Sequence, residues 1–280
     1  GPGVGAAPLA RAAHAGDVSA GAEGLPGAGD HHHAHPWIPF HFRQQYRPWD
    51  RDWGFCVTRD FYESLDPGEY EVVLRTDESK GTLKMLEHTH QGELDETIVL
   101  MAHLDHPGMA NDDLAGCAVG VELFRRLRER DTRLTYKLLL HQEVIGSEYY
   151  LASLTEAERD DIMEGLFLEM LGTETELGLQ AARGEEPTSV RVVLDRILEE
   201  REIPFRRGDY GDIVVNGEYV WDAYGIPVVS LSRYPYPEYH TDRDDVALMS
   251  PEALEQSVDV LIEAIDTLES APVMYRNFSG

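Results

Sequence analysis

Four continuous apolar runs constrain what this chain can fold into more than any other feature. They are residues 97–103 (TIVLMAH), 134–141 (LTYKLLLH), 165–171 (GLFLEML) and 226–232 (IPVVSLS). A strand buried on both faces lacks the alternation of apolar and polar residues and gives a run of this kind. The sequence therefore predicts four interior strands of a sheet.

Segments with helical periodicity lie between and after these runs. They predict helices over 112–130, 188–202 and 251–270, and a short helix over 217–224. The apolar stripe comprises Leu114, Cys117, Ala118, Val121, Phe124 and Leu127 in the first helix, and Leu254, Val258, Leu261, Ile265 and Leu268 in the last. Two further strands, 69–76 and 81–88, are predicted on either side of a turn. This alternation predicts an α/β fold, a three-layer α/β/α sandwich with a mainly parallel mixed central sheet.

The composition of the chain changes near residue 37. Residues 1–36 are rich in Gly, Ala and His, which predicts a flexible leader whose His run, 31–35, is a polar tract that could also buffer metal ions. Residues 37–280 are predicted to form one catalytic domain, with an aromatic and β-rich part over 37–96 and a core over 97–280. The sequence lacks a signal-peptide pattern and a membrane-length apolar run, so we expect a cytoplasmic protein.

The charge of the chain excludes one class of partner. Its 24 Lys and Arg residues against 52 Asp and Glu residues give a formal net charge of −28. Nucleic-acid backbones and anionic membranes are bound by basic patches, so neither is expected as a partner.

Polar side chains follow the predicted strands at the points where they end. His103 and Asp105 follow the first run, with Asp112 at the next helix, and His141, Gln142 and Glu143 follow the second. Glu169 lies near the end of the third run, and His240 comes after the fourth. In sheets of this kind, ligands bind beyond the carboxyl ends of the strands. Imidazoles and carboxylates gathered in one cleft would need a cation to offset their repulsion and desolvation, and such a donor set suits zinc, with manganese or cobalt possible.

At these residues the sequence resembles a known family. His103-Leu104-Asp105 followed by Ala110 to Gly116 (ANDDLAG) is similar to the signature of the zinc exopeptidases of clan MH, which include leucyl aminopeptidases and glutamate carboxypeptidases. WGFC at 53–56, HPGMANDDLAG at 106–116, IGS at 145–147 and PEYHT at 237–241 resemble a bacterial branch with aminopeptidase-like domains. The resemblance runs from about Pro39 to the C-terminus and implies the zinc-exopeptidase (phosphorylase/hydrolase-like) architecture.

The resemblance implies a role for each matching residue. His103 and Glu169 would bind one zinc ion, Asp112 would bridge two ions, and His240 would bind the other. Asp105 would act in catalysis by orienting His103, and Asp244 matches the acid that follows the last ligand. One or two zinc ions are therefore expected.

Glu143 admits two roles. The family pattern is Glu-Glu-x-Gly, with a general base followed by a zinc ligand, whereas this chain has Gln142-Glu143-Val144-Ile145-Gly146. Counted back from Gly146, Glu143 is the base and Val144 stands where a ligand should be. Counted from the strand end, Glu143 is the ligand and Gln142 occupies the position of the base. We favour the first alignment because it keeps the glycine spacing and a functional base, and His141 is a reserve candidate for either role.

Other residues are candidates for substrate binding. Glu218 could meet a substrate ammonium group, although an acid in the first turn of a helix is also common for structural reasons. Arg233 could bind a substrate carboxylate, and Tyr234 could line a pocket. The resulting prediction is a metallopeptidase or amidase that hydrolyses a small peptide or an aminoacyl amide, with Glu143 as general base. The alternatives are acyl transfer or cyclisation on the same scaffold, as in the related glutaminyl cyclases, a small-molecule amidase of a biosynthetic cluster, and a non-catalytic binding protein.

Overall fold

The structure of the chain, a computed structural model, describes residues 37–39, 56–68, 73, 75, 77, 79–106, 108–184 and 187–270. The described residues fall into two compact units. The residues before Leu83 form the first unit together with His240–Arg243, and Leu83–Tyr239 form the second together with Asp244–Ser270. The predicted leader lies outside the described residues, so its boundary and that of the 37–96 part stay predictions.

The first unit is described only in pieces. Helix α2 (Arg59–Glu63) begins after Thr58, whose side chain accepts a hydrogen bond from the amide of Phe61 and so caps the helix. Elsewhere in this unit, Pro39 pairs with Thr241 in an antiparallel bridge, and the Ile38 amide donates a 2.8 Å hydrogen bond to Asp242. Most of the predicted strand 69–76 lies outside the described residues.

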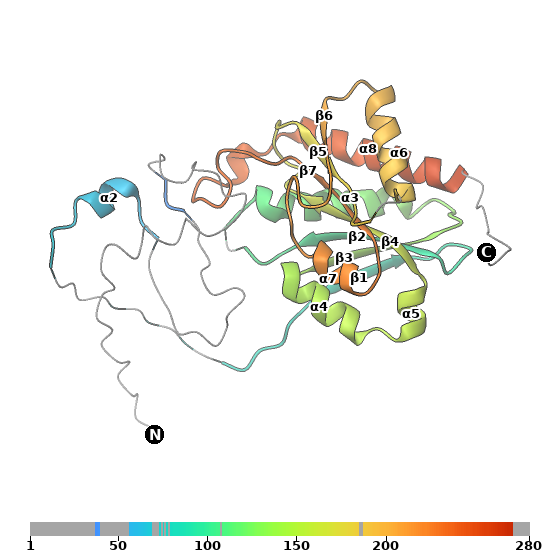
Figure 1. Cartoon of the computed structure of the whole chain (residues 1–280), viewed down its shortest axis with the longest axis horizontal. Coiled ribbons are helices and arrows are strands. Elements are labelled where there is room, and N and C mark those ends of the chain that lie inside the picture. The colour runs from blue at the N-terminus through green and yellow to red at the C-terminus, as the bar shows by residue number, and fades with distance from the viewer. Residues whose placement is uncertain are drawn as a thin grey trace. The chain divides into compact units, whose positions relative to one another are not determined.

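The described part of the second unit contains a seven-stranded sheet in the order β1-β3-β2-β4-β7-β5-β6 (Figure 1). The strands are β1 (Leu86–His90), β2 (Thr97–His103), β3 (Thr135–His141), β4 (Ile162–Glu169), β5 (Leu177–Gln180), β6 (Phe205–Gly208) and β7 (Val228–Ser232). Strands β3, β2, β4 and β7 are mutually parallel, whereas β1 pairs with β3 and β5 with β7 in antiparallel fashion. The mainly parallel mixed sheet is therefore confirmed, and the four apolar runs are its central strands.

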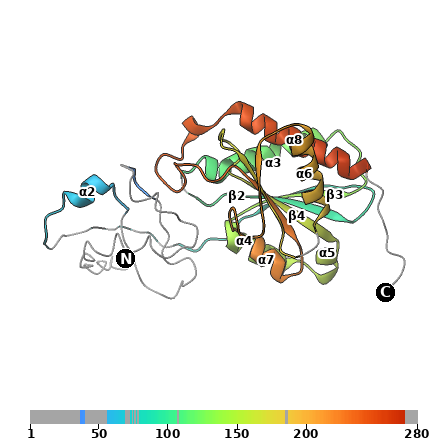
Figure 2. The same cartoon turned by 45° about the horizontal axis from the view of Figure 1, so that its top comes forward.

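Helices cover both faces of this sheet. Helices α3 (Gly116–Leu127), α6 (Ser189–Glu200) and α8 (Pro251–Ser270) lie on one face, and α4 (Glu143–Ser153), α5 (Glu156–Asp160) and α7 (Glu218–Ala223) lie on the other (Figure 2). A short 3-10 turn, η4 (Val246–Leu248), precedes α8. The predicted three-layer sandwich is confirmed. None of the helices in the described part of the chain combines the length and apolar composition that a membrane crossing requires.

Each central strand is buried on both faces because its side chains alternate between two apolar clusters. In β2, Ile98, Leu100 and Ala102 point to the cluster under α3, α6 and α8, whereas Val99 and Met101 point to the opposite one. We call the opposite one the α4–α7 cluster. It comprises Val99, Met101, Leu139, Tyr150, Leu151, Ile162, Phe167, Val220, Trp221, Ile226 and Val228.

Two predicted elements need correction. The predicted strand 81–88 is instead β1 at Leu86–His90, because only these residues pair with β3. The predicted helix 112–130 begins at Gly116, since residues Asn111–Ala115 form the irregular turn η3 with non-helical backbone angles at Asp112 and Asp113.

The apolar stripe predicted for this helix is also partly wrong. Leu114 and Val121 are 51% and 53% exposed. The buried face instead runs through Gly116 and Gly120, where an added Cβ would lie 2.1 Å from the carbonyl oxygen of Leu168 and 2.7 Å from the Leu138 side chain. Close contact through glycine fixes which face meets the sheet, and a pattern of apolar side chains cannot show it.

Candidate metal centre

A row of polar side chains crosses the sheet where the central strands end. His103 pairs with His141 in the parallel register, and Glu169 pairs with Ser232. Met101 pairs with Phe167 two residues earlier, which brings His103 and Glu169 to the same level. All four side chains are buried and, by strand alternation, face the layer of α4 and α7. The site therefore lies at the carboxyl ends of the strands, where the sequence placed it.

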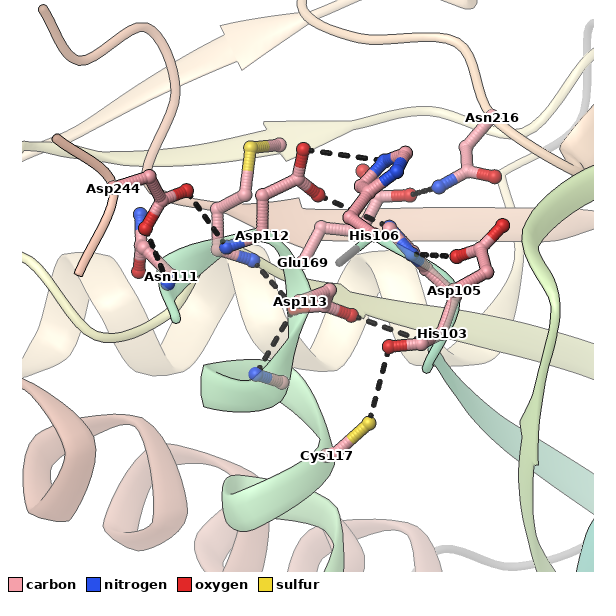
Figure 3. Close-up of polar contacts among 12 residues, drawn as sticks. His103, Asp105, His106, Asn111, Asp112, Asp113, Cys117, Glu169, Asn216 and Asp244 are labelled. Carbon is pink, nitrogen blue, oxygen red and sulfur yellow. Dashed lines mark hydrogen bonds and ion pairs between the residues drawn. The ribbon is translucent and has the colours of Figure 1, made fainter. Parts of the chain in front are cut away.

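His103 is held between two carboxylates. Its Nδ1 lies 2.8 Å from Oδ1 of Asp105, and its Nε2 lies 3.2 Å from Oδ1 of Asp112 (Figure 3). Burial opposes protonation of this imidazole, but the hydrogen bonds to Asp105 and Asp112 outweigh burial and raise the pKa of His103 well above its ordinary value. The bond to Asp105 fixes the orientation of the ring and directs Nε2 to Asp112, as in a metal-binding histidine.

His106 is a site residue that the sequence analysis did not single out. Its Nε2 lies 3.4 Å from Oδ2 of Asp112, and its ring is perpendicular to that of His103 at a centroid distance of 5.1 Å. One potential ligand atom from each of His103, His106 and Asp112 lies within 4.8 Å of the other two. The signal was a second histidine directly after the His103-Leu104-Asp105 motif.

Asp113 ties together the backbone around these side chains. Its Oδ2 accepts a 3.2 Å hydrogen bond from the amide of His103, and its Oδ1 accepts from the amides of Gly116 at 3.0 Å and Met170 at 2.9 Å. Burial raises the pKa of Asp113 to about 7. The Asp112–Asp113 peptide bond is cis. One carboxylate thus joins the ends of β2 and β4 to the start of α3.

Asp244 fixes the loop that carries Asp112. Its carboxylate accepts hydrogen bonds from the amides of Ala110 at 3.2 Å, Asn111 at 2.6 Å and Asp112 at 3.2 Å. The Tyr236 hydroxyl donates a fourth bond at 2.6 Å. Asp244 is buried, and these contacts make it an anchor for the loop.

Glu169 and Glu218 form a pair of buried acids beside this loop. The Asn216 side chain donates a 2.6 Å hydrogen bond to Oε1 of Glu169, whereas Oε2 is buried with no hydrogen-bond partner among the described residues. Glu218 accepts from the Asn216 amide at 2.6 Å and from the Ser230 hydroxyl. Burial raises the pKa of both acids, and the charge of Glu218 adds to the effect on Glu169. An unpartnered buried carboxylate oxygen beside other acids suits a bound cation.

Glu143 begins helix α4 and is half-buried. Its neighbours in the sequence, Gln142 and Val144, contact other parts of the chain. The Gln142 side chain donates to the carbonyl of Lys84 at 3.0 Å, and Val144 packs against the α4–α7 cluster. His141 lies 3.0 Å from the carbonyl of Gln142 and 3.4 Å from the Ser147 hydroxyl. Burial lowers the pKa of His141 to about 4. These contacts hold the His141 ring in the packed interior, and its reserve role as base or ligand stays a prediction.

Aromatic residues after β7 pack against one another. The Tyr239 ring meets the rings of Tyr234 and Tyr236 edge-on, at centroid distances of 4.9 and 5.8 Å. Burial raises the pKa of Tyr239 well above its ordinary value, and the charges of Asp112, Glu143 and Glu169 add to this effect. The sequence analysis did not single out Tyr239, and its signal was its place directly before His240.

Arg233 and His240 are two further site residues that the sequence predicts. The Arg233 guanidinium donates to the carbonyl of Thr175 at 2.7 Å and to the Gln256 side chain at 2.7 Å, so these contacts do not support a role in substrate binding. His240 belongs to the first unit, and its role as a metal ligand stays a prediction.

A family model and a bacterial protein match most of this chain. The model of a family described as "Domain of unknown function (DUF4910)" matches residues 32–271. A Clostridium acetobutylicum protein, provisionally named as a polysaccharide biosynthesis protein with an aminopeptidase-like domain, is 28% identical over 225 residues, which are 78% of this chain and 51% of that protein.

Solved structures share the fold. The crystal structure of a C. acetobutylicum protein provisionally described as a peptidase matches with a TM-score of 0.74 and 26% identity, over 84% of this chain and 55% of that one. A zinc aminopeptidase from Bacillus subtilis matches with a TM-score of 0.57 and 20% identity, over 67% and 51% of the two chains, which shows the fold alone. The chain thus has an aminopeptidase-like fold and spans about half the length of the proteins that it matches.

Proposed function

The chain belongs to the DUF4910 family, and on that premise we propose that it is a metal-dependent hydrolase of amide or peptide bonds, of the zinc-exopeptidase clan. The observation that carries the proposal is the meeting of His103, His106 and Asp112 at the carboxyl ends of the central strands. The similarity to a protein described as a peptidase and the aminopeptidase-like fold support the same reaction class.

Zinc fits the residues at this site. The donors are imidazole nitrogens and carboxylate oxygens, and a buried oxygen of Glu169 has no hydrogen-bond partner among the described residues. His103, Asp112 and Glu169 would hold the ion, with His106 beside them, and the role of His240 as a ligand stays a prediction of the resemblance. Manganese or cobalt could replace zinc, since both accept these donors. A bound zinc ion lowers the pKa of water toward roughly 7 and polarises a carbonyl group.

Three residues of the chain have separate roles in the proposed hydrolysis. Glu143 takes a proton from the attacking water and returns it to the leaving amine, a general acid–base role suited to a half-buried carboxylate at the start of a helix. A tyrosine hydroxyl is protonated at neutral pH, and Tyr239 is the proposed donor of a hydrogen bond to the substrate carbonyl. Asp105 keeps the His103 ring in place.

The surroundings of Val144 support the alignment in which Glu143 is the general base. Its side chain packs against the apolar α4–α7 cluster, as expected for the residue that replaces the second Glu of the family pattern. We therefore keep Glu143 as the base. The substrate class is a small peptide or an aminoacyl amide, whose amino group is favoured by the net charge of −28. We also propose the cytoplasm as the compartment, which fits Cys56 and Cys117 because both are free thiols.

A metal-exchange assay tests this function. The chain is freed of metal with a chelator, dialysed, and assayed for amine release from a panel of aminoacyl amides and dipeptides before and after addition of zinc, manganese or cobalt. We expect activity only after a metal is restored. Unchanged activity in the metal-free protein would contradict metal dependence. Metal binding without release of product from any amide would favour a binding protein instead, and mass spectra of the products would reveal cyclisation.

A further inference from the structure

Asp112 lies between two imidazoles, and each of its carboxylate oxygens faces a different one. Oδ1 lies 3.2 Å from Nε2 of His103, and Oδ2 lies 3.4 Å from Nε2 of His106 (Figure 3). The two rings are perpendicular to each other at 88°. Asp112 and His103 are fully buried, and the His106 side chain is 11% exposed.

These two nitrogen–oxygen distances suit a metal ion between each His–Asp pair better than they suit two ionic hydrogen bonds. Charge-assisted N–H···O bonds measure about 2.7–2.9 Å, which is shorter than either contact. Two ligands bound at about 2.0–2.1 Å to a tetrahedral zinc ion lie roughly 3.3–3.4 Å apart. Both His–Asp separations are close to this value, so each can accommodate one ion between its nitrogen and its oxygen.

The chain also lacks a ligand that the family pattern provides. In the favoured alignment, Val144 stands at the position of the zinc-binding Glu, and its side chain packs against the α4–α7 cluster. The roles that the resemblance implies include none for His106, although this residue begins the HPGMANDDLAG segment shared with the bacterial branch. His106 nevertheless presents a nitrogen to the oxygen of Asp112 that His103 does not face.

The resemblance already implies that Asp112 bridges two ions, and we propose that His106 supplies a ligand of the second ion in place of the carboxylate missing at Val144. The inference rests on the proposed function, because it assumes that His103, Asp112 and Glu169 hold the first ion. Two divalent ions would also offset the four acids buried at this site, Asp112, Asp113, Glu169 and Glu218. The second ion would thus be bound by an imidazole nitrogen where the Glu-Glu-x-Gly pattern provides a carboxylate oxygen.

Zinc stoichiometry and affinity test the inference without an activity assay. All proteins carry Ala at His31, His32, His33 and His35, so that the leader does not contribute metal sites. Zinc is titrated into the metal-free full chain and into His106→Ala, His106→Asn and the control His88→Ala, which removes an exposed imidazole on β1. We expect two ions for the parent and the control, whereas the His106 variants should keep one ion and bind the second about 10–100-fold more weakly.

Nitrogen-15 spectra of histidine in the parent protein give a second measurement, in which the zinc titration itself is made on the unsubstituted site. The His103 and His106 ring signals, assigned by single substitutions, should shift at different zinc equivalents. A single ion in the parent, or His106 variants that keep both ions with unchanged affinity, would overturn the inference and leave the proposed function standing. A parent protein that binds neither zinc nor manganese nor cobalt would overturn both.

Discussion

Asn216 donates a 2.6 Å hydrogen bond from its side chain to Oε1 of Glu169, while Oε2 of the same carboxylate is buried without a hydrogen-bond partner in the described part of the chain. One oxygen is thus fixed and the other is left for a ligand. Asn216 comes from the loop before α7, so this loop sets the orientation of a side chain on β4.

Replacing Glu169 by Gln tests its role. Glu169→Gln keeps the shape of the side chain but removes the negative charge, so we expect zinc affinity to fall by about 10–100-fold, measured by competition with a chromophoric chelator. Glu164→Gln is the matched control, because Glu164 is a buried acid on the same strand that accepts a hydrogen bond from the Val190 amide of α6. Equal zinc affinity in the two variants would argue against Glu169 as a ligand.

Replacing Glu143 by Gln separates a base from a ligand. If Glu143 is the base, Glu143→Gln should keep the zinc content of the parent and lose about 10²–10⁴-fold in kcat on an aminoacyl amide. Zinc content by mass spectrometry and kcat are measured on the same preparation. Loss of zinc together with activity would mean that Glu143 is a ligand and that the alignment of Val144 with the missing Glu is wrong.

Asp244 should contribute strongly to stability through the loop that carries Asp112. Asp244→Asn removes a charged acceptor of three backbone hydrogen bonds, and each bond to a charged group is worth about 1.5–3 kcal/mol. We expect a clear decrease in the free energy of unfolding in urea and weaker zinc binding. Tyr236→Phe removes only one donor to the same carboxylate and should have the smaller effect. The reverse order would show that Asp244 is not the anchor of the loop.

Gly146 is required by close contact with His141. An added Cβ would lie 2.6 Å from Nδ1 of His141, whose ring is buried. Gly146→Ala should therefore decrease the free energy of unfolding by about 1–3 kcal/mol, as overpacking of a core does. At Gly81 an added Cβ meets nothing within 4 Å, so Gly81→Ala should change stability by no more than about 0.5 kcal/mol. Similar urea midpoints for the two variants would contradict this prediction.

The pKa of Glu164 is raised by burial, and this has a consequence for stability. The folded state holds the proton of this carboxyl more tightly than the unfolded state, so the contribution to stability grows as the pH falls through the raised pKa and is lost as the pH rises through it. Glu164→Gln removes the titration. The difference in unfolding free energy between the parent and this variant should therefore shift in favour of the parent between pH 7.5 and pH 5. A difference that does not vary with pH would contradict the raised pKa.

The sequence alone determined the central strands and the edge of the sheet where the site lies. The apolar runs specify β2, β3, β4 and β7, because a strand buried on both faces needs apolar side chains throughout. Since parallel strands end at one edge, the placement of His103 and Glu169 near each other followed from the same pattern. These conclusions depend on local periodicity, which a sequence contains in full.

Only the tertiary structure decided which side chains face each other. Asp244 binds the amide of Ala110 from 134 residues away, and the turn that it holds directs Asp112 to both His103 and His106. The sequence likewise does not reveal that Val144 packs against the α4–α7 cluster or that Arg233 donates a hydrogen bond to Gln256. Such contacts arise from irregular loops and from backbone amides, whose hydrogen bonds carry no sequence pattern, so they become visible only when distant segments are packed together.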